Sequence, residues 1–307
     1  MIDYRGYPPQ LAKLAGAPFD SDQWIYEVKH DGERVLAFRD GAELQLRSRS
    51  GRDVTAQFPD VVGSCLALPL NRYVLDCEAV VLNQKGVAEF SLIQQRGMAN
   101  PPPAALRSHP VILMAFDILR MNDIDTRGYA LTDRKIVLQA LLKIANVSAI
   151  RPVEHVAALG RQLYALAEQS GWEGVVAKRA ASTYTGTRSN DWLKFKCRRR
   201  GSFVVIGWTD PQNSREHFGA LAVAERDSRG QLRYVGKCGT GYTDQHLAEI
   251  AALLKLTDQP ACETGERDIH YCAPTLTIEC EFLDRTCTGQ LRHASFKGLR
   301  PALILVK

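Results

Sequence analysis

The chain has 307 residues and a formal net charge of +5, from 39 basic and 34 acidic side chains. A hydrophobic fraction of 45% and a charged fraction of 24% are those of ordinary globular proteins, and they argue against intrinsic disorder and against collagen-like or coiled-coil architecture. No apolar run approaches the roughly 20 residues that cross a bilayer, and the first residues lack the apolar core of a signal peptide. The length predicts two domains, and we expect a cytoplasmic protein with no membrane partner.

The first part of the chain mixes short strands with helices. Runs of apolar and β-branched residues predict strands over residues 24–28, 34–39, 73–82 and 111–119. Apolar residues at helical spacing predict helices over 130–144 and 156–169, the first capped by Thr132 or Asp133. The three prolines at 101–103 predict a loop, because proline removes a backbone donor and fixes φ.

The character of the sequence changes near Arg198, beyond which short strands follow one another. These strands are predicted over residues 203–208, 219–224, 232–237, 276–282 and 302–306. One helix, over residues 244–256, interrupts them. Several short strands with turn signals and one helix favour a small β-barrel of the OB type. We therefore predict a first domain over residues 1–198 and a second over residues 199–307.

The eight cysteines form no C-x-x-C pair, which argues against a structural zinc site. Four of them, at 262, 272, 280 and 287, leave a metal cluster as an alternative that their irregular spacing disfavours. Because no secretion signal is present, reduced thiols are favoured over disulfides.

The segment around Lys29 carries the most informative pattern, K-x-D-G-x-R. A predicted strand leads into Lys29, Asp31 and Gly32 predict a turn, and Arg34 begins the returning strand. A lysine is a nucleophile only after it loses its proton, and burial with nearby positive charge would lower its pKa toward that state. The alternative for so short a pattern is an exposed lysine at a hairpin.

Further charged residues recur in or beside otherwise apolar strands, and two of the three pairs are spaced at period two. They are Asp76 and Glu78 in one strand, Glu173 and Lys178 around a second, and Lys194 and Lys196 in a third. Residues two apart in a strand share a face, and buried charges are unfavourable unless a partner compensates them. Paired carboxylates suit a divalent metal ion, and paired lysines suit phosphate oxygens. Three such strands in one chain predict a charged cleft.

Residues 194–200 also form a basic run at the predicted domain junction. Its five cations are Lys194, Lys196, Arg198, Arg199 and Arg200. Such a run is commonly a solvated face, and a phosphate-binding role competes with that interpretation because the run lies at the junction beside an aromatic residue.

Taken in order, these segments resemble the motifs of the covalent nucleotidyltransferases, the superfamily of ATP-dependent DNA ligases, RNA ligases and mRNA capping enzymes. The matching segments are KHDGER at 29–34, SRSG at 48–51, LDCE at 75–78, AFD at 115–117, EGVVAK at 173–178 and WLKFK at 192–196. Cys77 stands where the family usually has glycine. Segments 90–96, 234–242 and 291–300 are similar to the ligase domain of the bacterial Ligase D group, with Ala294 where proline is frequent.

The resemblance implies an α+β fold, with an adenylation (nucleotidyltransferase) domain of antiparallel sheets and helices followed by an OB-fold β-barrel. It also implies an ATP-dependent DNA ligase that joins a 5′-phosphate to a 3′-hydroxyl at nicks, in repair or end joining. Lys29 would take AMP from ATP, AMP would pass to the 5′-phosphate, and the 3′-hydroxyl would then displace it. The expected cofactors are ATP and Mg²⁺ or Mn²⁺. The expected partners are nicked double-stranded DNA and an end-binding Ku-type protein. We also expect the protein to be a monomer and, in a bacterium, to associate with the nucleoid.

The resemblance assigns roles residue by residue. Lys29, Lys194 and Lys196 are the expected catalytic residues. The expected ATP-binding residues are Glu27, Val28, Arg34, Arg49, Glu78, Phe116, Lys178, Arg292 and Lys297. The expected metal ligands are Glu78 and Glu173. The expected DNA-binding residues are Arg34, Arg49, Arg198, Arg199, Arg200 and Lys237.

Within this set, Phe116 would stack on adenine and Glu27 would help to recognise its edge. Arg292 and Lys297 would orient the departing pyrophosphate, which requires the OB domain to close over ATP and later to swing away. The alternatives without a role in ATP binding are that Phe116 is an aromatic residue of the hydrophobic core and that Arg292 and Lys297 are solvated surface cations.

Two other functions compete with DNA ligation. An RNA ligase or capping guanylyltransferase would use the same first domain, although the Ligase D-like second domain argues against capping. A catalytically silent nucleic-acid-binding module would be expected to lack Lys29 or the carboxylates, and all of them are present.

Overall fold

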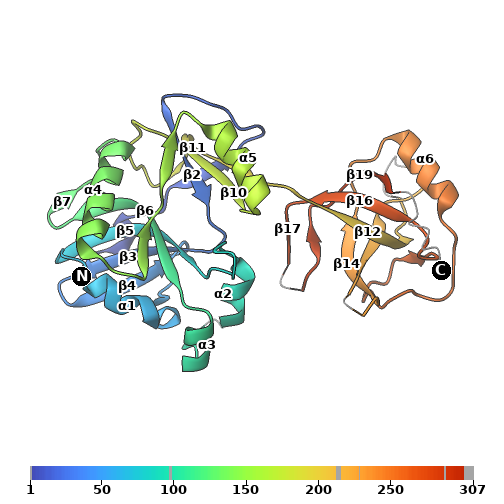
Figure 1. Ribbon diagram of the computed structural model, residues 1–307, viewed down its shortest axis with the longest axis horizontal. Helices are drawn as coiled ribbons and strands as arrows, with labels where there is room; N and C mark the ends of the chain where they lie inside the picture. The colour runs from blue at the N-terminus through green and yellow to red at the C-terminus, as the bar shows by residue number, and fades with distance from the viewer. Residues whose placement is uncertain (1, 97–98, 212–215, 228, 287, 301–307) are drawn as a thin grey trace. The chain divides into compact units, whose positions relative to one another are not determined.

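The computed structural model describes residues 2–96, 99–211, 216–227, 229–286 and 288–300 (Figure 1). The chain divides into two compact units, Met1–Cys197 and Arg198–Lys307, and each is described by itself. Both combine antiparallel sheets with a few helices, so the predicted α+β class is confirmed. No helix in the described ranges is long and apolar enough to cross a membrane.

In its described residues, the first unit contains two sheets and five α-helices. The first sheet has the order β1 (Leu11–Leu14), β11 (Arg188–Lys196), β10 (Gly174–Arg179), β2 (Trp24–Lys29) and β9 (His155–Ala157). The second has the order β4 (Glu43–Ser48), β3 (Glu33–Asp40), β5 (Arg72–Val80), β6 (Ile112–Met121) and β7 (Ile124–Asp125), with β8 (Ile150–Pro152) parallel to β6. The helices are α1 (Pro59–Leu66), α2 (Phe90–Arg96), α3 (Pro103–Ser108), α4 (Leu131–Ala145) and α5 (Gly160–Ser170). Because β2 and β3 are consecutive but belong to different sheets, the turn between them joins the two sheets.

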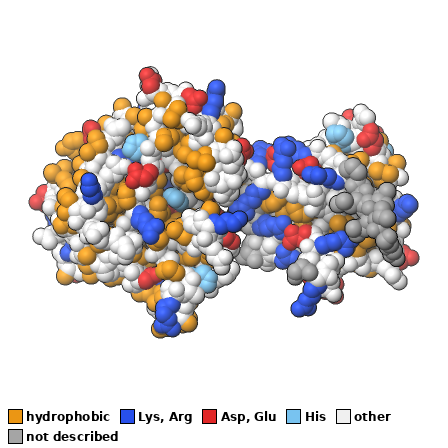
Figure 2. Space-filling view, in the orientation of Figure 1, with side chains coloured by type: hydrophobic (Ala, Val, Ile, Leu, Met, Phe, Trp, Pro, Cys, Tyr) orange, Lys and Arg blue, Asp and Glu red, His pale blue; other side chains and the backbone are white. Residues whose placement is uncertain are grey.

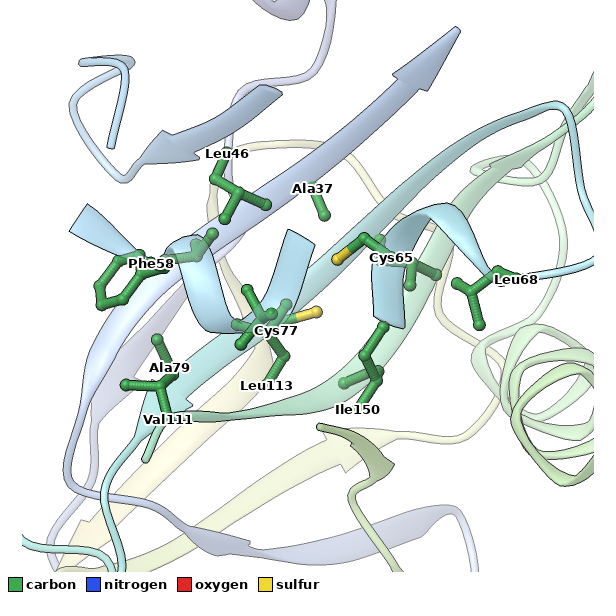
Figure 3. Close-up of a cluster of buried hydrophobic side chains, with 14 of the residues drawn as sticks. Ala37, Leu46, Phe58, Cys65, Leu68, Cys77, Ala79, Val111, Leu113 and Ile150 are labelled. Atoms are coloured by element: carbon green, nitrogen blue, oxygen red, sulfur yellow. The ribbon is translucent and has the colours of Figure 1, made fainter. Parts of the chain in front are cut away.

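A hydrophobic core lies against one face of the second sheet. Figure 3 shows Phe58, Cys65 and Cys77 among the side chains gathered there, and all three are fully buried. Along β5 the alternation of side chains places Cys77 in this core and Asp76 and Glu78 on the opposite face. The strand therefore stabilises the fold with one face and presents carboxylates with the other.

The second unit is built on a sheet with the order β14 (Leu232–Cys238), β13 (Leu221–Arg226), β12 (Arg199–Trp208), β16 (Thr277–Phe282) and β19 (Ser295–Arg300). The short strand β15 (His270–Tyr271) pairs with β12, and β17 (Asp284–Arg285) pairs with β18 (Leu291–Arg292). Its core includes Phe203, Val223 and Ile278, and α6 (Asp244–Leu253) contributes Leu247 and Ile250 to it. Thr243 caps α6 by accepting a hydrogen bond from the His246 amide.

Most of the predicted elements are found, and three predictions are wrong in part. The helix expected at 130–144 begins at Leu131 after Ala130, with no side-chain cap from Thr132 or Asp133. The Thr132 amide instead donates to the Ala180 carbonyl, so a tertiary contact satisfies this helix end. Pro103, expected in a loop, is the first residue of α3, a position that proline tolerates because the helix needs no donor there.

The helix expected over 156–169 begins at Gly160 instead. Its first residues form β9, where Ala157 pairs with Ile25 of β2, and Ala158 turns the chain with a left-handed φ of 61°. A Cβ on Gly160 would lie 2.1 Å from the Phe19 carbonyl oxygen, so any side chain at this position would collide with the Phe19 backbone. Pairing of β9 with β2 at the edge of the sheet thus outweighs the helical spacing of apolar residues at the start of this segment.

Two further predictions concern the C-terminus and the cysteines. The strand expected over 302–306 lies outside the described residues, and β19 ends at Arg300. The cysteines described as free thiols are at 65, 77, 197, 238, 262, 272 and 280. Within the described part of the chain, no group of three or more histidine, cysteine, aspartate or glutamate side chains could hold a metal ion.

A buried ion pair fastens α4 to β6. Arg134 donates from Nε and Nη2 to both oxygens of Asp117, at 2.7 and 2.8 Å, and neither side chain is exposed. Removing one partner of such a pair leaves an uncompensated buried charge. This contact is therefore expected to dominate the stability of the α4 attachment.

We predict that Arg134→Met lowers the free energy of unfolding by about 3–5 kcal/mol, measured by urea denaturation. The matched control is Arg161→Gln, because Arg161 forms an exposed ion pair with Asp20 at 3.8 Å, and such pairs contribute about 0–1 kcal/mol. Equal effects of the two substitutions would contradict the assignment of Asp117 as a buried carboxylate that needs Arg134.

Candidate active site

Lys29 lies at the end of β2, where the register of three strands gathers charged groups. Gly174 of β10 is paired with Lys29 on one side and with Lys196 of β11 on the other. Glu173 precedes Gly174, and its two carboxylate oxygens accept from Lys29 Nζ at 2.5 Å and from Lys196 Nζ at 2.8 Å. One carboxylate thus bridges two of the three lysines that the sequence predicted to be catalytic.

Glycines make this approach possible. Gly174 has a φ of +152°, and a Cβ there would lie 2.0 Å from the Phe195 carbonyl oxygen. A Cβ on Gly32 would lie 2.3 Å from the carbonyl oxygen of Ala79 on β5. The glycine of the K-x-D-G-x-R pattern therefore lets the turn after Lys29 pack directly against β5.

The expectation of a lowered Lys29 pKa is wrong for the free protein. Burial lowers the pKa of Lys29, but the charges of Glu173 and Glu78 outweigh burial, and the pKa lies above its ordinary value. The sequence argument counted nearby cations and could not place two carboxylates beside the amine. Lys29 is therefore an ammonium group that must lose a proton before it attacks.

Glu78 is a carboxylate in the same pocket that lacks a close cation. It takes part in none of the ion pairs found among the described residues. Burial raises the pKa of Glu78 to about 7, an effect that the charges of Lys29 and Arg34 only partly offset. A carboxylate held in this way fits a divalent cation, which binds protein through one or two carboxylates and takes its other ligands from phosphates and water.

Glu27 and Lys178 belong to a buried charge network that forms part of the pocket wall. The Glu27 carboxylate lies 2.5 Å from Lys135 Nζ and 2.6 Å from Lys178 Nζ. Burial raises the pKa of Glu27, but the charges of the two lysines outweigh it and the net direction is downward. Burial also lowers the pKa of Lys178 to about 8.

Lys135 was missed by the sequence analysis, because a lysine in an amphipathic helix ordinarily faces solvent. It lies on α4, is 1% exposed and donates in addition to the Val153 carbonyl. Only the packing of α4 shows that it reaches Glu27. His30 was missed too, although it follows Lys29 directly; it lines the pocket, and burial lowers its pKa to about 4.

Phe116 forms part of the pocket wall and is largely buried. Its ring centroid lies 4.4 Å from Lys178 Nζ and 4.6 Å from the guanidinium carbon of Arg34, and its edge packs on Trp192. Phe116 therefore packs in a hydrophobic cluster, as the core alternative expects, and also lines the pocket, as the ATP-binding prediction requires. Stacking on adenine stays a prediction.

Arg34 is held by a partner of its own. It donates from Nε and Nη2 to the two oxygens of Asp76, at 2.6 and 2.5 Å, and Tyr184 donates to the same carboxylate at 2.6 Å. Asp76 is completely buried, so the arginine compensates its charge. Arg34 lines the pocket from this fixed position.

One pocket brings together most of the predicted site. The predicted residues that line it are Glu27, Val28, Lys29, Arg34, Arg49, Glu78, Phe116, Lys178 and Lys194. Arg49, which is exposed, also lines a neighbouring cavity with Ser50, Arg52 and Phe90. The pocket thus has an apolar wall, a basic rim and a carboxylate next to an amine, a combination suited to a nucleoside phosphate.

Glu173 and Lys196 are not among the residues that line the pocket, although Glu173 binds the pocket residue Lys29. The other predicted residues belong to the second unit. Arg198, Arg200 and Lys297 surround Glu281, and Lys237 forms an ion pair with Glu266 at 2.8 Å. Arg199 and Arg292 are exposed at the surface.

Comparison with protein families gives two matches that together span most of the chain. Residues 9–196 match the ATP dependent DNA ligase domain, and residues 214–302 match the ATP dependent DNA ligase C terminal region. The chain belongs to the ATP-dependent DNA ligases. The family consists of enzymes that form phosphodiester bonds, and the order of an adenylation domain before an OB-fold domain agrees with the predicted architecture.

Curated relatives include the multifunctional non-homologous end joining protein LigD of Pseudomonas aeruginosa, which is 34% identical over 303 residues, covering 95% of this chain and 35% of the relative. LigD of Mycobacterium tuberculosis is 34% identical over 310 residues, covering 98% of this chain and 39% of the relative. The chain therefore spans little more than a third of these relatives. The solved ligase domain of M. tuberculosis LigD is 33% identical and covers 98% of this chain and 97% of that chain, with a TM-score of 0.59.

A second solved structure bears on the nucleotide. It is a mycobacterial DNA ligase D complexed with ATP and MES, 33% identical, covering 98% of this chain and 97% of that chain with a TM-score of 0.58. ATP use by the family fits the nucleoside-phosphate character of the pocket. The comparisons give no support to the RNA-ligase or capping alternative.

The raised pKa of Glu78 makes a prediction about stability. The folded protein holds a proton on Glu78 up to about pH 7, whereas the unfolded chain releases it near its ordinary value of 4.5, so folding loses stability as the pH rises between these values. We predict that the melting temperature of Glu78→Gln relative to wild type increases between about pH 5 and about pH 8, by calorimetry without divalent cations.

The control is Glu43→Gln, an exposed position on β4 whose difference from wild type should stay flat over the same range. Added Mg²⁺ or Mn²⁺ should raise the melting temperature of wild type more than that of Glu78→Gln. A Glu78→Gln difference that does not change with pH would contradict the partly buried, unpaired state of this carboxylate.

Proposed function

We propose that this chain joins a 5′-phosphate to a 3′-hydroxyl in nicked duplex DNA through a lysyl-AMP and a DNA-adenylate. The observation that carries the proposal is the position of Lys29. It lies in a pocket with an aromatic wall and a basic rim, bound to Glu173 and influenced by the charge of Glu78. An amine so placed suits attack on a phosphorus atom whose charge the surrounding lysines offset.

The chemistry follows from the charges. Lys29 Nζ forms a bond to the α-phosphorus of ATP while the bond to pyrophosphate breaks, and the amine gives up its proton. An oxygen of the 5′-phosphate then forms a bond to the phosphorus of AMP while the bond from that phosphorus to Lys29 Nζ breaks and releases the lysine amine. This transfer gives the 5′-phosphate a good leaving group, because a phosphate monoester alone offers only a poor oxide leaving group. Finally the 3′-hydroxyl attacks that phosphorus and AMP leaves. Lys194 and Lys196 stabilise the charge that builds up on the phosphate oxygens.

Glu78 and Glu173 are the residues that would hold Mg²⁺ or Mn²⁺. When bound, such an ion supplies neutralisation of phosphate charge. Glu173 already binds Lys29 and Lys196, so its carboxylate can exchange a lysine for a cation without becoming an unpaired charge. The donor set of two carboxylates is incomplete alone, which agrees with a site that ATP phosphates complete.

Lys178, Glu27 and Phe116 are proposed to hold the adenine end of ATP. Phe116 and Trp192 offer the apolar wall, and the Glu27–Lys178 contact offers charge beside it. Arg34 and Arg49 are proposed to bind ribose, phosphate or the 5′-phosphate of DNA. Arg34 is held by Asp76, whereas Arg49 is exposed at the rim of the pocket.

End joining, recruitment by a Ku-type protein, the monomeric state and nucleoid association remain proposals. They draw on the LigD relatives, of which this chain spans little more than a third. An end-binding partner would bring the enzyme to broken ends, and nick sealing does not by itself require one.

We predict that the protein becomes labelled when incubated with α-³²P-ATP and Mg²⁺ or Mn²⁺, and that Lys29→Ala and Lys29→Arg abolish the label. The arginine variant preserves the charge opposite Glu173 but lacks the primary amine. The control is Lys85→Ala, an exposed lysine outside the pocket, which should label like wild type. A wild-type protein that never becomes labelled would contradict the ligase proposal.

We predict that Arg292→Ala slows self-adenylation by about tenfold or more while sealing of a pre-adenylated nick changes much less. The reason is that the proposed partner of Arg292 is the departing pyrophosphate, which is absent from the later steps. Arg229→Ala removes another exposed arginine of the second unit and serves as the control. Equal losses in both assays would refute the role of Arg292.

A further inference from the structure

Three cations in the second unit converge on one carboxylate, and we name this set of four residues the Glu281 cluster. The Glu281 side chain, on β16, is 10% exposed. Its Oε1 accepts from Arg198 Nη1 at 2.8 Å and lies 3.4 Å from Lys297 Nζ. Its Oε2 accepts from Nε and Nη2 of Arg200, both at 3.3 Å.

The strand register explains why these side chains meet. Arg200 on β12 lies directly opposite Glu281 on β16. Lys297 lies on β19, on the other side of β16, where the pairing has an irregularity next to Gly298. The neighbours of Glu281 along β16, Cys280 and Phe282, are packed in the core, so Glu281 faces outward.

The cluster is not neutral, because three cations and one carboxylate leave an excess of positive charge. The side chains of Arg198 and Arg200 are 58% and 62% exposed, so both guanidinium groups keep donors available to solvent. Burial raises the pKa of Glu281, but the hydrogen bond from Arg198 and the charge of Lys297 outweigh burial, and the pKa is lowered. Figure 2 shows lysine and arginine side chains with carboxylates among them on the face of this unit that is in view.

Several cations that converge on one oxyanion form the arrangement with which proteins bind phosphate groups. We propose that the Glu281 carboxylate occupies a phosphate-binding position, and that a phosphodiester of DNA competes with it for Arg198, Arg200 and Lys297. Glu281 thereby limits the affinity of the second unit for DNA and favours release of the sealed product. This inference rests on the proposed function, because it takes DNA as the substrate.

The test is equilibrium binding of a fluorescent nicked duplex to the full chain, without ATP or divalent cations, over a range of salt concentrations. Glu281→Gln keeps the size of the side chain and removes its charge. It should tighten binding by about tenfold at low salt and steepen the dependence of log affinity on log salt by about one, since one more phosphate is contacted. In the presence of Arg200→Gln the gain should disappear.

Glu225→Gln is the charge-matched control. Glu225 holds Arg285 at 2.7 Å and Arg233 at 2.6 Å in the same unit, so this substitution also adds one positive charge and frees two arginines. If the position of Glu281 matters, Glu225→Gln gains much less affinity. Equal gains would show a general charge effect and would overturn the proposal, as would unchanged or weaker binding by Glu281→Gln.

If Glu281→Gln does not fold, as judged by its thermal transition, the cations test the same idea in the wild-type background. Arg198→Gln and Arg200→Gln should each weaken binding and reduce the salt dependence, and no change in either would overturn the proposal. The wild-type labelling and nick-sealing assays separate this inference from the proposed function. Wild type that labels and seals, together with Glu281→Gln that fails to tighten, refutes the role of Glu281 alone.

Discussion

The Glu173 carboxylate fixes the geometry of the pocket because it binds Lys29 and Lys196 at once. That bridge depends on β10 lying between β2 and β11, with Gly174 opposite both lysines. A side chain at Gly174 would collide with the Phe195 backbone and push β11 away. Lys29 as the proposed nucleophile, Lys196 as a proposed phosphate-binding residue and Glu173 as a proposed metal ligand are therefore brought together by the backbone pairing of three strands.

The first unit contains many buried charges, and nearly all are compensated. Asp76 is paired with Arg34, Asp117 with Arg134, and Glu27 with two lysines. Glu78 differs, because burial raises its pKa and none of the ion pairs in the described ranges includes it. A carboxylate with a raised pKa in an otherwise balanced pocket marks a candidate functional site, and this agrees with the proposed cation-binding role of Glu78.

The second unit arranges its charges in another way. Glu281 and Glu225 are carboxylates that each gather arginines from neighbouring strands at the protein surface. Such clusters keep cations oriented, and their carboxylates reduce the positive electrostatic potential at the surface that would attract DNA. An enzyme that must bind a polyanion, seal it and release it benefits from moderate affinity, which is consistent with carboxylates embedded among its basic residues.

The sequence by itself determined the two-part α+β architecture, the main strands and most of the charged residues that line the pocket, because each motif is local and its residue types indicate its chemistry. It could not show that Lys135 on α4 reaches Glu27 or that Glu281 collects Arg198, Arg200 and Lys297, since these contacts join segments far apart in the chain. The helix start at Gly160 and the raised pKa of Lys29 were likewise decided by tertiary contacts, with β2 in one case and with two carboxylates in the other. The length of 307 residues predicted the number of domains, and the net charge of +5 gave only the sum of the charges. Which charges pair was decided by the fold, because the energy of a charge depends on its distance from its partners and from water.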